Sequence, residues 1–427
     1  MPCDCDKKET YFLNFRLNVV AVNRMKFIVS LGMPLLVRIF SHLSARDKKA
    51  VASSCVFLWR VMSEPLLWAE VTLSRRRLEE GLEAVTELFY TPRYSLLACL
   101  NLSNLKYLFI DKTRIADFLK YLLQNTNLRS VNLSNNDLSA IPAFPLASNL
   151  ARVTSLEMSN TKLGTEQLNS LLGKCCRGRY TKNVNLSFND FSYVNPDLLA
   201  ESIVSLERVN LSYTDLTPMY TRRLLESLKK ASVKELDLSG NDLTSCKLDN
   251  IGLNQNLSIL KLSEVKFNPE KLDDIFTNMT FIHNLRELCL NGSTLYDVNP
   301  IILSDAVVRV ERVDLNFCWL YADHIEFILD GITEDTMLRY LNLSGNHFED
   351  VNIDLLLLAI TNLEQIRIEC ANLSEEHFQA LVNDTEELPK RTKIVLNHFE
   401  LITKNIELHR LAKLHPNIEL NLQNFDL

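Results

Sequence analysis

The eleven residues from Leu128 to Leu138 read LRSVNLSNNDL, and this stretch decides the fold. Apolar residues occupy its first, fourth, sixth and eleventh positions, and Asn136 occupies the ninth. Alternate side chains of a strand point to the same side, so Val131 and Leu133 are expected to face inward while Asn132 faces out. A buried Asn136 can bond backbone groups where the chain turns away from the strand. The stretch therefore predicts a short strand followed by a turn.

The same pattern recurs along most of the chain. Short spacings of 24 or 25 residues between copies alternate with long spacings of 27 or 28, up to a last spacing of 26. Thr and Asn also alternate at the ninth position through the first half, so two kinds of repeat take turns. Twelve copies begin at Leu128, Val153, Thr181, Leu206, Val233, Leu257, Leu285, Val310, Leu338, Leu363, Arg391 and Asn417, and an earlier copy begins at Leu105.

A helical pattern follows the strand in several repeats. Thr217-Pro218 is a capping residue with a first-turn proline, and an apolar face at Leu224, Leu225 and Leu228 follows. Thr165 is expected to cap a second such helix. A strand on one side and a helix on the other, repeated in register, predict an α/β solenoid. Its parallel sheet lines a concave face, its helices lie outside, and each repeat is stabilised by its neighbours.

The repeats resemble leucine-rich repeats, and their alternation resembles the ribonuclease-inhibitor-like subclass. The resemblance implies a horseshoe over residues 71–427 with about 12–14 repeats. The composition fits this class, because 77 of the 427 residues are Leu and 39 are Asn.

Residues 31–68 do not follow the repeat. They read LGMPLLVRIFSHLSARDKKAVASSCVFLWRVMSEPLLW, with helical apolar spacing at Leu35, Leu36, Ile39, Phe40 and Leu43. Pro34 suits a first helical turn, and Glu64-Pro65 is expected to end a third short helix. We therefore predict a small three-helix module over residues 31–70, preceded by an N-terminal extension over residues 1–30 that is expected to be disordered. Such a module is too small for a strong core of its own, which makes a docking partner plausible.

This module resembles an F-box, and the chain as a whole resembles the F-box/leucine-rich-repeat proteins. Leu31, Leu35, Leu36, Ile39, Phe40, Ser41 and Leu43 match the first half of the F-box pattern without a gap. Gly32 and Pro34 depart from it, since the family favours Pro and Glu there. The second half is matched by Cys55, Trp59, Arg60, Glu64, Pro65, Leu67 and Trp68.

The resemblance implies a non-catalytic substrate receptor of an SCF-type cullin-RING ubiquitin ligase. The F-box would dock on the Skp-family adaptor, and the repeats would hold a protein substrate near the ubiquitin-conjugating enzyme. The module's own core and the adaptor are expected to share the apolar positions about equally. The residues expected to include the adaptor contacts are Leu31, Pro34, Leu35, Leu36, Ile39, Phe40, Leu43, Val51, Trp59, Leu67 and Trp68.

The substrate is expected on the concave face, where fifth-position residues are polar and of mixed charge. Aromatic residues interrupt this face or its edge, and exposed aromatics are enriched at binding hot spots. Phe188 and Phe317 have an equally weighted alternative, which is to pack under the loop after the strand. The candidate substrate-binding residues are Phe188, Tyr213, Asp237, Lys261, Asp314, Phe317, Trp319, Tyr340 and Arg367.

The composition and the motifs argue against several other classes of protein. The net charge of −7 argues against a general nucleic-acid binder. No uncharged apolar run approaches the ~20 residues of a membrane span, and no cofactor, metal or catalytic motif is evident. Reduced thiols are expected for the ten Cys residues, in the cytoplasm, the nucleus or both.

An alternative reading belongs to another class. It is a leucine-rich-repeat binding or inhibitor protein, such as a regulator of a small GTPase, whose N-terminal helices only cap the solenoid. An enzyme is the least favoured class.

Overall fold

The computed structural model describes residues 33–43, 51, 61, 70–72, 99–101, 128–244, 254–383, 392–397 and 418–421. The chain divides into two compact units, Met1–Asn101 and Leu102–Leu427. In the first unit, helix α2 spans Met33–Ser41, and strand β1 (Glu70–Thr72) pairs in parallel with strand β2 (Cys99–Asn101). The second and third predicted helices fall mostly outside the described residues, which include only Val51 and Val61 from this stretch, both helical.

The second unit contains a parallel sheet whose described strands pair in chain order. The strands are β3 (Ser130–Asn132), β4 (Ser155–Glu157), β5 (Asn183–Asn185), β6 (Arg208–Asn210), β7 (Glu235–Asp237), β8 (Ile259–Lys261), β9 (Glu287–Cys289), β10 (Arg312–Asp314), β11 (Tyr340–Asn342), β12 (Gln365–Arg367), β13 (Lys393–Asn397) and β14 (Ile418–Asn421).

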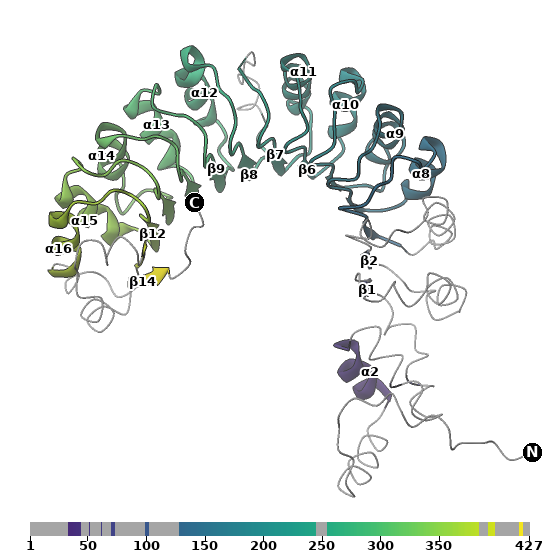
Figure 1. The fold of residues 1–427 in the computed structure, drawn as a ribbon, viewed down its shortest axis with the longest axis horizontal. Helices are drawn as coiled ribbons and strands as arrows, with labels where there is room; N and C mark the ends of the chain where they lie inside the picture. Colours follow the sequence, from purple (N-terminus) through teal and green to yellow (C-terminus); the bar gives the residue numbers. More distant parts are fainter. Residues whose placement is uncertain are drawn as a thin grey trace, which may run out of the picture. The chain divides into compact units, whose positions relative to one another are not determined.

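A helix follows most of these strands. The helices are α8 (Ala143–Leu150), α9 (Thr165–Leu171) continued by the π-helix η4 (Leu172–Cys176), α10 (Pro196–Ile203), α11 (Pro218–Leu228), the 3-10 helix η6 (Pro269–Lys271) with α12 (Leu272–Met279), α13 (Pro300–Val307), α14 (Ala322–Asp330), α15 (Ile353–Asn362) and α16 (Glu375–Asn383). Figure 1 shows that within residues 128–383 the strands line the inner side of an arc and the helices its outer side. The predicted solenoid is therefore confirmed over these repeats.

The core lies between the sheet and the helices. The middle residue of each strand from β3 to β12 is buried, and the helices bury the face turned toward it, as Leu199 and Ile203 do in α10. In register, Val313 of β10 lies beside Leu288 and Leu341 of the neighbouring strands. The inward-facing apolar residues of the strands therefore pack against the apolar faces of the helices in one continuous core layer.

Helix starts follow the sequence signals with one correction. Thr217 stands at the N-cap of α11 and Pro218 is its first residue, as expected, although the Thr217 side chain makes no capping hydrogen bond. Thr165 is not a cap but the first residue of α9, since Gly164 stands before it and donates its N–H to Gln167 Oε1 at 2.8 Å. Asn side chains cap four other helical segments, a use of Asn that the repeat pattern did not predict; these caps are Asn195, Asn268, Asn299 and Asn352.

The ninth-position Asn joins neighbouring repeats through its side-chain amide. Asn241 Nδ2 donates to the carbonyls of Leu238, in its own repeat, at 2.9 Å and of Leu211, in the preceding repeat, at 2.8 Å. Its Oδ1 accepts from the N–H groups of Thr214 at 3.2 Å and Leu216 at 3.1 Å, also in the preceding repeat. The predicted bonding of the turn is confirmed, and the bridge to the repeat before it is new.

Other repeats use the same bridge or a weaker version of it. Asn189 and Asn346 bond their preceding repeats in the same way. Ser293 makes only two such bonds, donating to Leu262 O and accepting from Val265 N. A shorter side chain therefore makes fewer of the cross-repeat bonds, as expected for Thr and Cys at this position.

Replacing a bridging Asn is expected to destabilise the array more than replacing its hydroxyl partner. Asn241→Ala leaves several buried backbone groups without a partner, so we expect the free energy of unfolding to fall by about 3 kcal/mol or more. Thr214→Val removes only the hydroxyl bonds to Leu211 O and Asn241 Oδ1, and is expected to cost about 1 kcal/mol. Urea unfolding followed by circular dichroism measures both. Equal midpoints for the two variants would contradict the bridge.

Candidate protein-binding surface

The concave face consists of the first and third residues of each three-residue strand, which flank the buried middle one. These side chains are half-buried or exposed, and most are polar. Two hollows lie on this face, one of about 280 Å³ over strands β4–β8 and one of about 220 Å³ over strands β9–β12. The concave face is therefore an open polar surface with two shallow recesses.

The β4–β8 hollow has an acidic balance. Glu157, Glu235 and Asp237 line it together with Arg208 and Lys261, which gives a formal charge of 2 − 3 = −1. Arg208 Nε lies 2.9 Å from Glu235 Oε1, so its charge is neutralised within the face. Burial raises the pKa of Glu157, which a hydrogen bond with Asn185 partly offsets.

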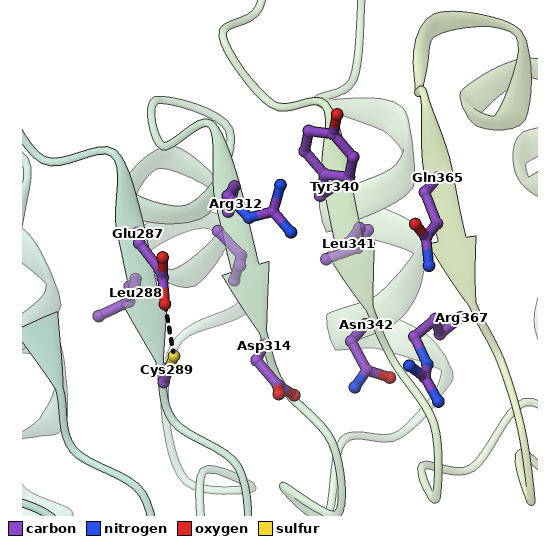
Figure 2. A pocket seen from close by; sticks show the side chains of 11 residues that line it. Glu287, Leu288, Cys289, Arg312, Asp314, Tyr340, Leu341, Asn342, Gln365 and Arg367 are labelled. Carbon is purple, nitrogen blue, oxygen red and sulfur yellow. Dashed lines mark hydrogen bonds between the residues drawn. The ribbon is translucent and has the colours of Figure 1, made fainter. Parts of the chain in front are cut away.

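The β9–β12 hollow combines charged, amide and aromatic groups (Figure 2). Arg312 lies with its guanidinium carbon 4.0 Å from the centroid of the Tyr340 ring. The Tyr340 hydroxyl donates to Glu364 Oε2 at 2.6 Å, and this bond raises the pKa of Tyr340. Arg367 bonds the buried Glu369 at 2.6 Å. Tyr340 is thus positioned by Arg312 on the face of its ring and by Glu364 at its hydroxyl.

Acidic side chains in the same hollow are used locally. Asp314 Oδ1 accepts the N–H of Asn316 at 3.0 Å, while burial raises the pKa of Asp314. Glu287 accepts a weak hydrogen bond from Cys289 Sγ at 3.7 Å. Other residues that end a strand, such as Asn210 and Asp237, accept a hydrogen bond from the backbone N–H two residues later. The last residue of each of these strands occupies the fifth position of its repeat, so it stabilises the turn as well as facing the concave side.

Exposed aromatic residues stand at the rim, where the chain leaves the strand. The eighth position of every described repeat has a positive φ; Gly occupies it at Gly240, Gly292 and Gly345, and aromatic residues occupy it at Phe188, Tyr213 and Phe317. The Phe188 and Tyr213 rings stack at 4.7 Å. Phe188 is 54% and Phe317 47% exposed, so neither packs under its loop.

The rim glycines leave room for these rings. A Cβ at Gly240 would overlap the ring of Tyr213, and one at Gly345 would overlap the ring of Phe317. Burial raises the pKa of Tyr213 to about 12, and the hydrogen bond and charge of Glu264, the next eighth-position residue after Gly240, add to this rise. Each rim ring therefore lies over the following repeat.

The nine candidate substrate residues fall into three places. Asp237 and Lys261 line the β4–β8 hollow, and Asp314, Tyr340 and Arg367 line the β9–β12 hollow. Phe188, Tyr213, Phe317 and Trp319 lie on the rim, and Trp319 has a positive φ as well. The predicted set is therefore not one site but two hollows and an edge.

Most of the strand-initial residues in the two hollows were not predicted, and Tyr340 of β11 is the exception. Arg208 and Glu235 in one hollow, and Glu287, Arg312 and Gln365 in the other, all occupy this position. The signal was present, because residues two apart in a strand face the same side. The charged candidates were all fifth-position residues, and among third-position residues only the aromatic Tyr340 was predicted.

Helix α2 contains five of the residues expected at the adaptor contact or its core. Leu36 and Phe40 are buried, whereas Ile39 is 45% exposed. Leu43, just after the helix, and Val51 are half-buried, and Pro34 and Leu35 belong to α2. The calls at Leu31, Trp59, Leu67 and Trp68 lie outside the described residues.

Comparison with known proteins identifies the repeats. A family model described as a leucine-rich repeat matches residues 124–141, 229–252 and 334–351. Each match includes a ninth-position Asn, at Asn136, Asn241 and Asn346. The array is built of leucine-rich repeats. The matching model describes a repeat and not a catalytic domain, and no F-box was found.

Curated relatives match only through part of their length. The human NACHT, LRR and PYD domains-containing protein 13 is 26% identical over 136 residues, which covers 30% of this chain. The mouse NACHT, LRR and PYD domains-containing protein 4B is 31% identical over 113 residues, which covers 25% of this chain. Each match spans 13% of the relative.

Similar solved structures include a bacterial leucine-rich-repeat protein and a bacterial internalin. A protein of Leptospira interrogans aligns with a TM-score of 0.45 and 20% identity, over 76% of this chain and 94% of its own. An internalin of Listeria monocytogenes aligns with a TM-score of 0.45 and 14% identity, over 81% of this chain and 95% of its own.

Metal and membrane features were also sought within the described residues. There, no cluster of three or more His, Cys, Asp or Glu side chains is arranged to hold a metal ion. In the same part of the chain, no helix is long and apolar enough to span a bilayer.

Substituting a rim glycine is expected to be costly where a ring lies over it. Gly345→Ala places a Cβ at a φ of +67° and against Phe317, so we expect a loss of about 2–4 kcal/mol in unfolding free energy. Adding Phe317→Ala should recover the part due to the ring. Gly173→Ala is the control, since its Cβ would come no closer than 3.9 Å to Leu198 Cδ1. Additive losses in the double variant would contradict the ring contact.

The thiol of Cys289 reports on the electrostatics of the β9–β12 hollow. Burial, with the charges of Glu287 and Asp314, raises its pKa to about 12. Iodoacetamide alkylation at Cys289 is therefore expected to keep rising about tenfold per pH unit beyond pH 9. Glu287→Gln should speed the reaction by lowering that pKa. Peptide mass spectrometry measures the rate, and a plateau near pH 9 in the parent protein would contradict this.

Proposed function

We propose that this leucine-rich-repeat protein is a non-catalytic receptor whose concave face binds a protein ligand. The observation that carries the proposal is the open face of charged and amide side chains, bordered by exposed aromatic rings. Protein interfaces combine such a polar surface with aromatic anchors, and leucine-rich repeats offer it on a scaffold suited to protein binding. The ligand would be recognised without being chemically changed by this chain.

We further propose that residues 31–70 dock on a Skp-family adaptor, which makes the chain the substrate receptor of a cullin-RING ubiquitin ligase in the cytoplasm or nucleus. Two observations support this: the gap-free F-box-like match at Leu31–Leu43, and a helix that buries Leu36 and Phe40 while exposing Ile39. The receptor's contribution would be proximity, which raises the effective concentration of substrate lysines at the conjugating enzyme.

The exposure of individual side chains in α2 determines which substitution can test adaptor docking. Leu36 is buried, so a charge there would disturb the helix itself, whereas Ile39 offers an exposed apolar side chain. We expect Ile39→Asp to abolish co-purification of the full-length chain with a purified Skp adaptor. His42→Asp places the same charge on an exposed polar residue at the end of the helix and should leave co-purification unchanged.

The outcomes separate the two readings of residues 31–70. Failure of the intact chain to bind the adaptor would overturn the ligase proposal. If deleting residues 31–70 then also unfolded the repeats, the N-terminal segment would be a cap on a leucine-rich-repeat binding protein, such as an inhibitor or a small-GTPase regulator. Protein binding by the concave face would stand in both cases.

A further inference from the structure

Arg312 differs from the other arginines of the concave face. Arg208 lies 2.9 Å from Glu235, and Arg367 lies 2.6 Å from Glu369, so both are neutralised by a carboxylate of this chain. Arg312 is exposed and forms no ion pair with any carboxylate of the described residues. A guanidinium presents its N–H donors as a planar fork that fits a carboxylate. Arg312 is therefore the concave-face arginine whose charge is open to a partner.

The side chain of Arg312 is also held in place. It lies on the Tyr340 ring, and the Tyr340 hydroxyl is fixed by Glu364. Figure 2 shows the Arg312 guanidinium directed toward Tyr340, while the Glu287 carboxyl on the neighbouring strand is directed toward Cys289. Arg312 also shares a side-chain hydrogen bond with Tyr340, and its remaining in-plane donors stay available to a ligand. Holding the guanidinium in this way reduces the entropy lost on binding.

Exposed rings follow Arg312 along the same repeat. Phe317, Trp319 and Tyr321 are each about half exposed, at 47%, 55% and 50%. Tyr321 stacks on His347 at 4.7 Å, and Trp319 lies at 6.1 Å from the same imidazole. Phe317 and Trp319 flank the buried Cys318, and both have the positive φ that the same turn shows at Tyr213 and Asp215 in an earlier repeat. The turn geometry therefore fixes where both rings leave the chain.

We propose that the repeats of β10 and β11 bind an acidic segment of a partner protein. An Asp or Glu carboxylate of the segment pairs with the Arg312 guanidinium, and a nearby apolar side chain packs on the rings of Trp319 and Phe317. The proposal rests on protein binding by the concave face and adds the location and the chemistry of the ligand. Charge complementarity decides the occupant, since an open cation at the start of β10 and exposed rings in the turn after the same strand favour a segment that carries both an acid and an apolar group.

The β4–β8 hollow does not offer the same recognition. Its arginine is already paired, Lys261 stands beside Asp237 in the register, and the hollow has one more acid than base. An acidic segment placed there would meet Glu157 and Glu235 with no open guanidinium to pair with. The rim rings of that half, Phe188 and Tyr213, are stacked on each other. The two hollows therefore differ in the charge of the ligand that they favour.

Selection of peptides on the full-length chain tests the proposal. A phage-displayed library of random 12-residue peptides is selected against the protein, and the most enriched sequence, synthesised with fluorescein, is the probe for fluorescence anisotropy. We expect the enriched peptides to place an Asp or Glu close to an aromatic or large aliphatic residue. Binding of the probe should weaken as ionic strength rises.

Matched variants locate the bound probe. Arg312→Gln and Trp319→Ser should each weaken binding at least tenfold. Arg208→Gln, which removes the paired concave arginine, and Tyr193→Ser, which removes a ring that is 79% exposed elsewhere, should stay within twofold. Arg312→Glu should abolish binding, and a probe with Lys in place of its acid should restore it, which a loss of folding cannot do.

Each outcome bears on the inference. Three results would overturn it. They are a selection that enriches no peptide, enriched peptides that lack acidic residues, and a loss of probe affinity in the Arg208 variant that equals the loss in the Arg312 variant. Binding that maps to the β4–β8 hollow would overturn the inference while protein binding by the concave face stands. Adaptor co-purification is measured independently of the probe, so failure of the ligase proposal is distinguishable from failure here.

Discussion

The hydrogen bonds of the ninth-position Asn amide hold the rest of this structure in place. A strand of three residues cannot stand alone, because it makes too few backbone bonds and buries one side chain on its inner face. The Asn amide satisfies the carbonyls of its own turn and, at the same time, the N–H groups and a carbonyl of the repeat before it. Leaving those buried groups without partners would lower the unfolding free energy by about 1–3 kcal/mol each.

This bonding also places the groups that face a ligand. Once the turn after each strand is fixed, the eighth residue adopts a positive φ, and in the described repeats this residue is a glycine, an asparagine, an aromatic residue, Glu264 or Cys370. Where a ring precedes a glycine, as Phe317 precedes Gly345, the ring lies over the next repeat and stays partly exposed. The aromatic rim is thus a consequence of the turn geometry, and the concave side chains keep a fixed spacing beside it.

Much of this was predictable from the sequence, and the failures have definite physical causes. The register was predictable because Val131, Val313 and their equivalents obey one strict spacing. The inter-repeat bonds of Asn189 and Asn241 were not, because hydrogen-bond partners 27 or 28 residues apart leave no local pattern. Arg312 was missed although strand alternation points to it. Its open charge depends on the direction of Glu287, which only the three-dimensional arrangement reveals.

The most direct test of this account is hydrogen exchange, followed by mass spectrometry, in the full-length Asn346→Ala variant. Asn346 bonds Leu315 O, Cys318 N and Leu320 N of the preceding repeat as well as Leu343 O of its own. The account predicts faster exchange in peptides covering both repeats, including residues 315–320, with protection retained in residues 183–216. Faster exchange confined to the repeat of Asn346 would contradict the claim that this amide couples neighbouring repeats.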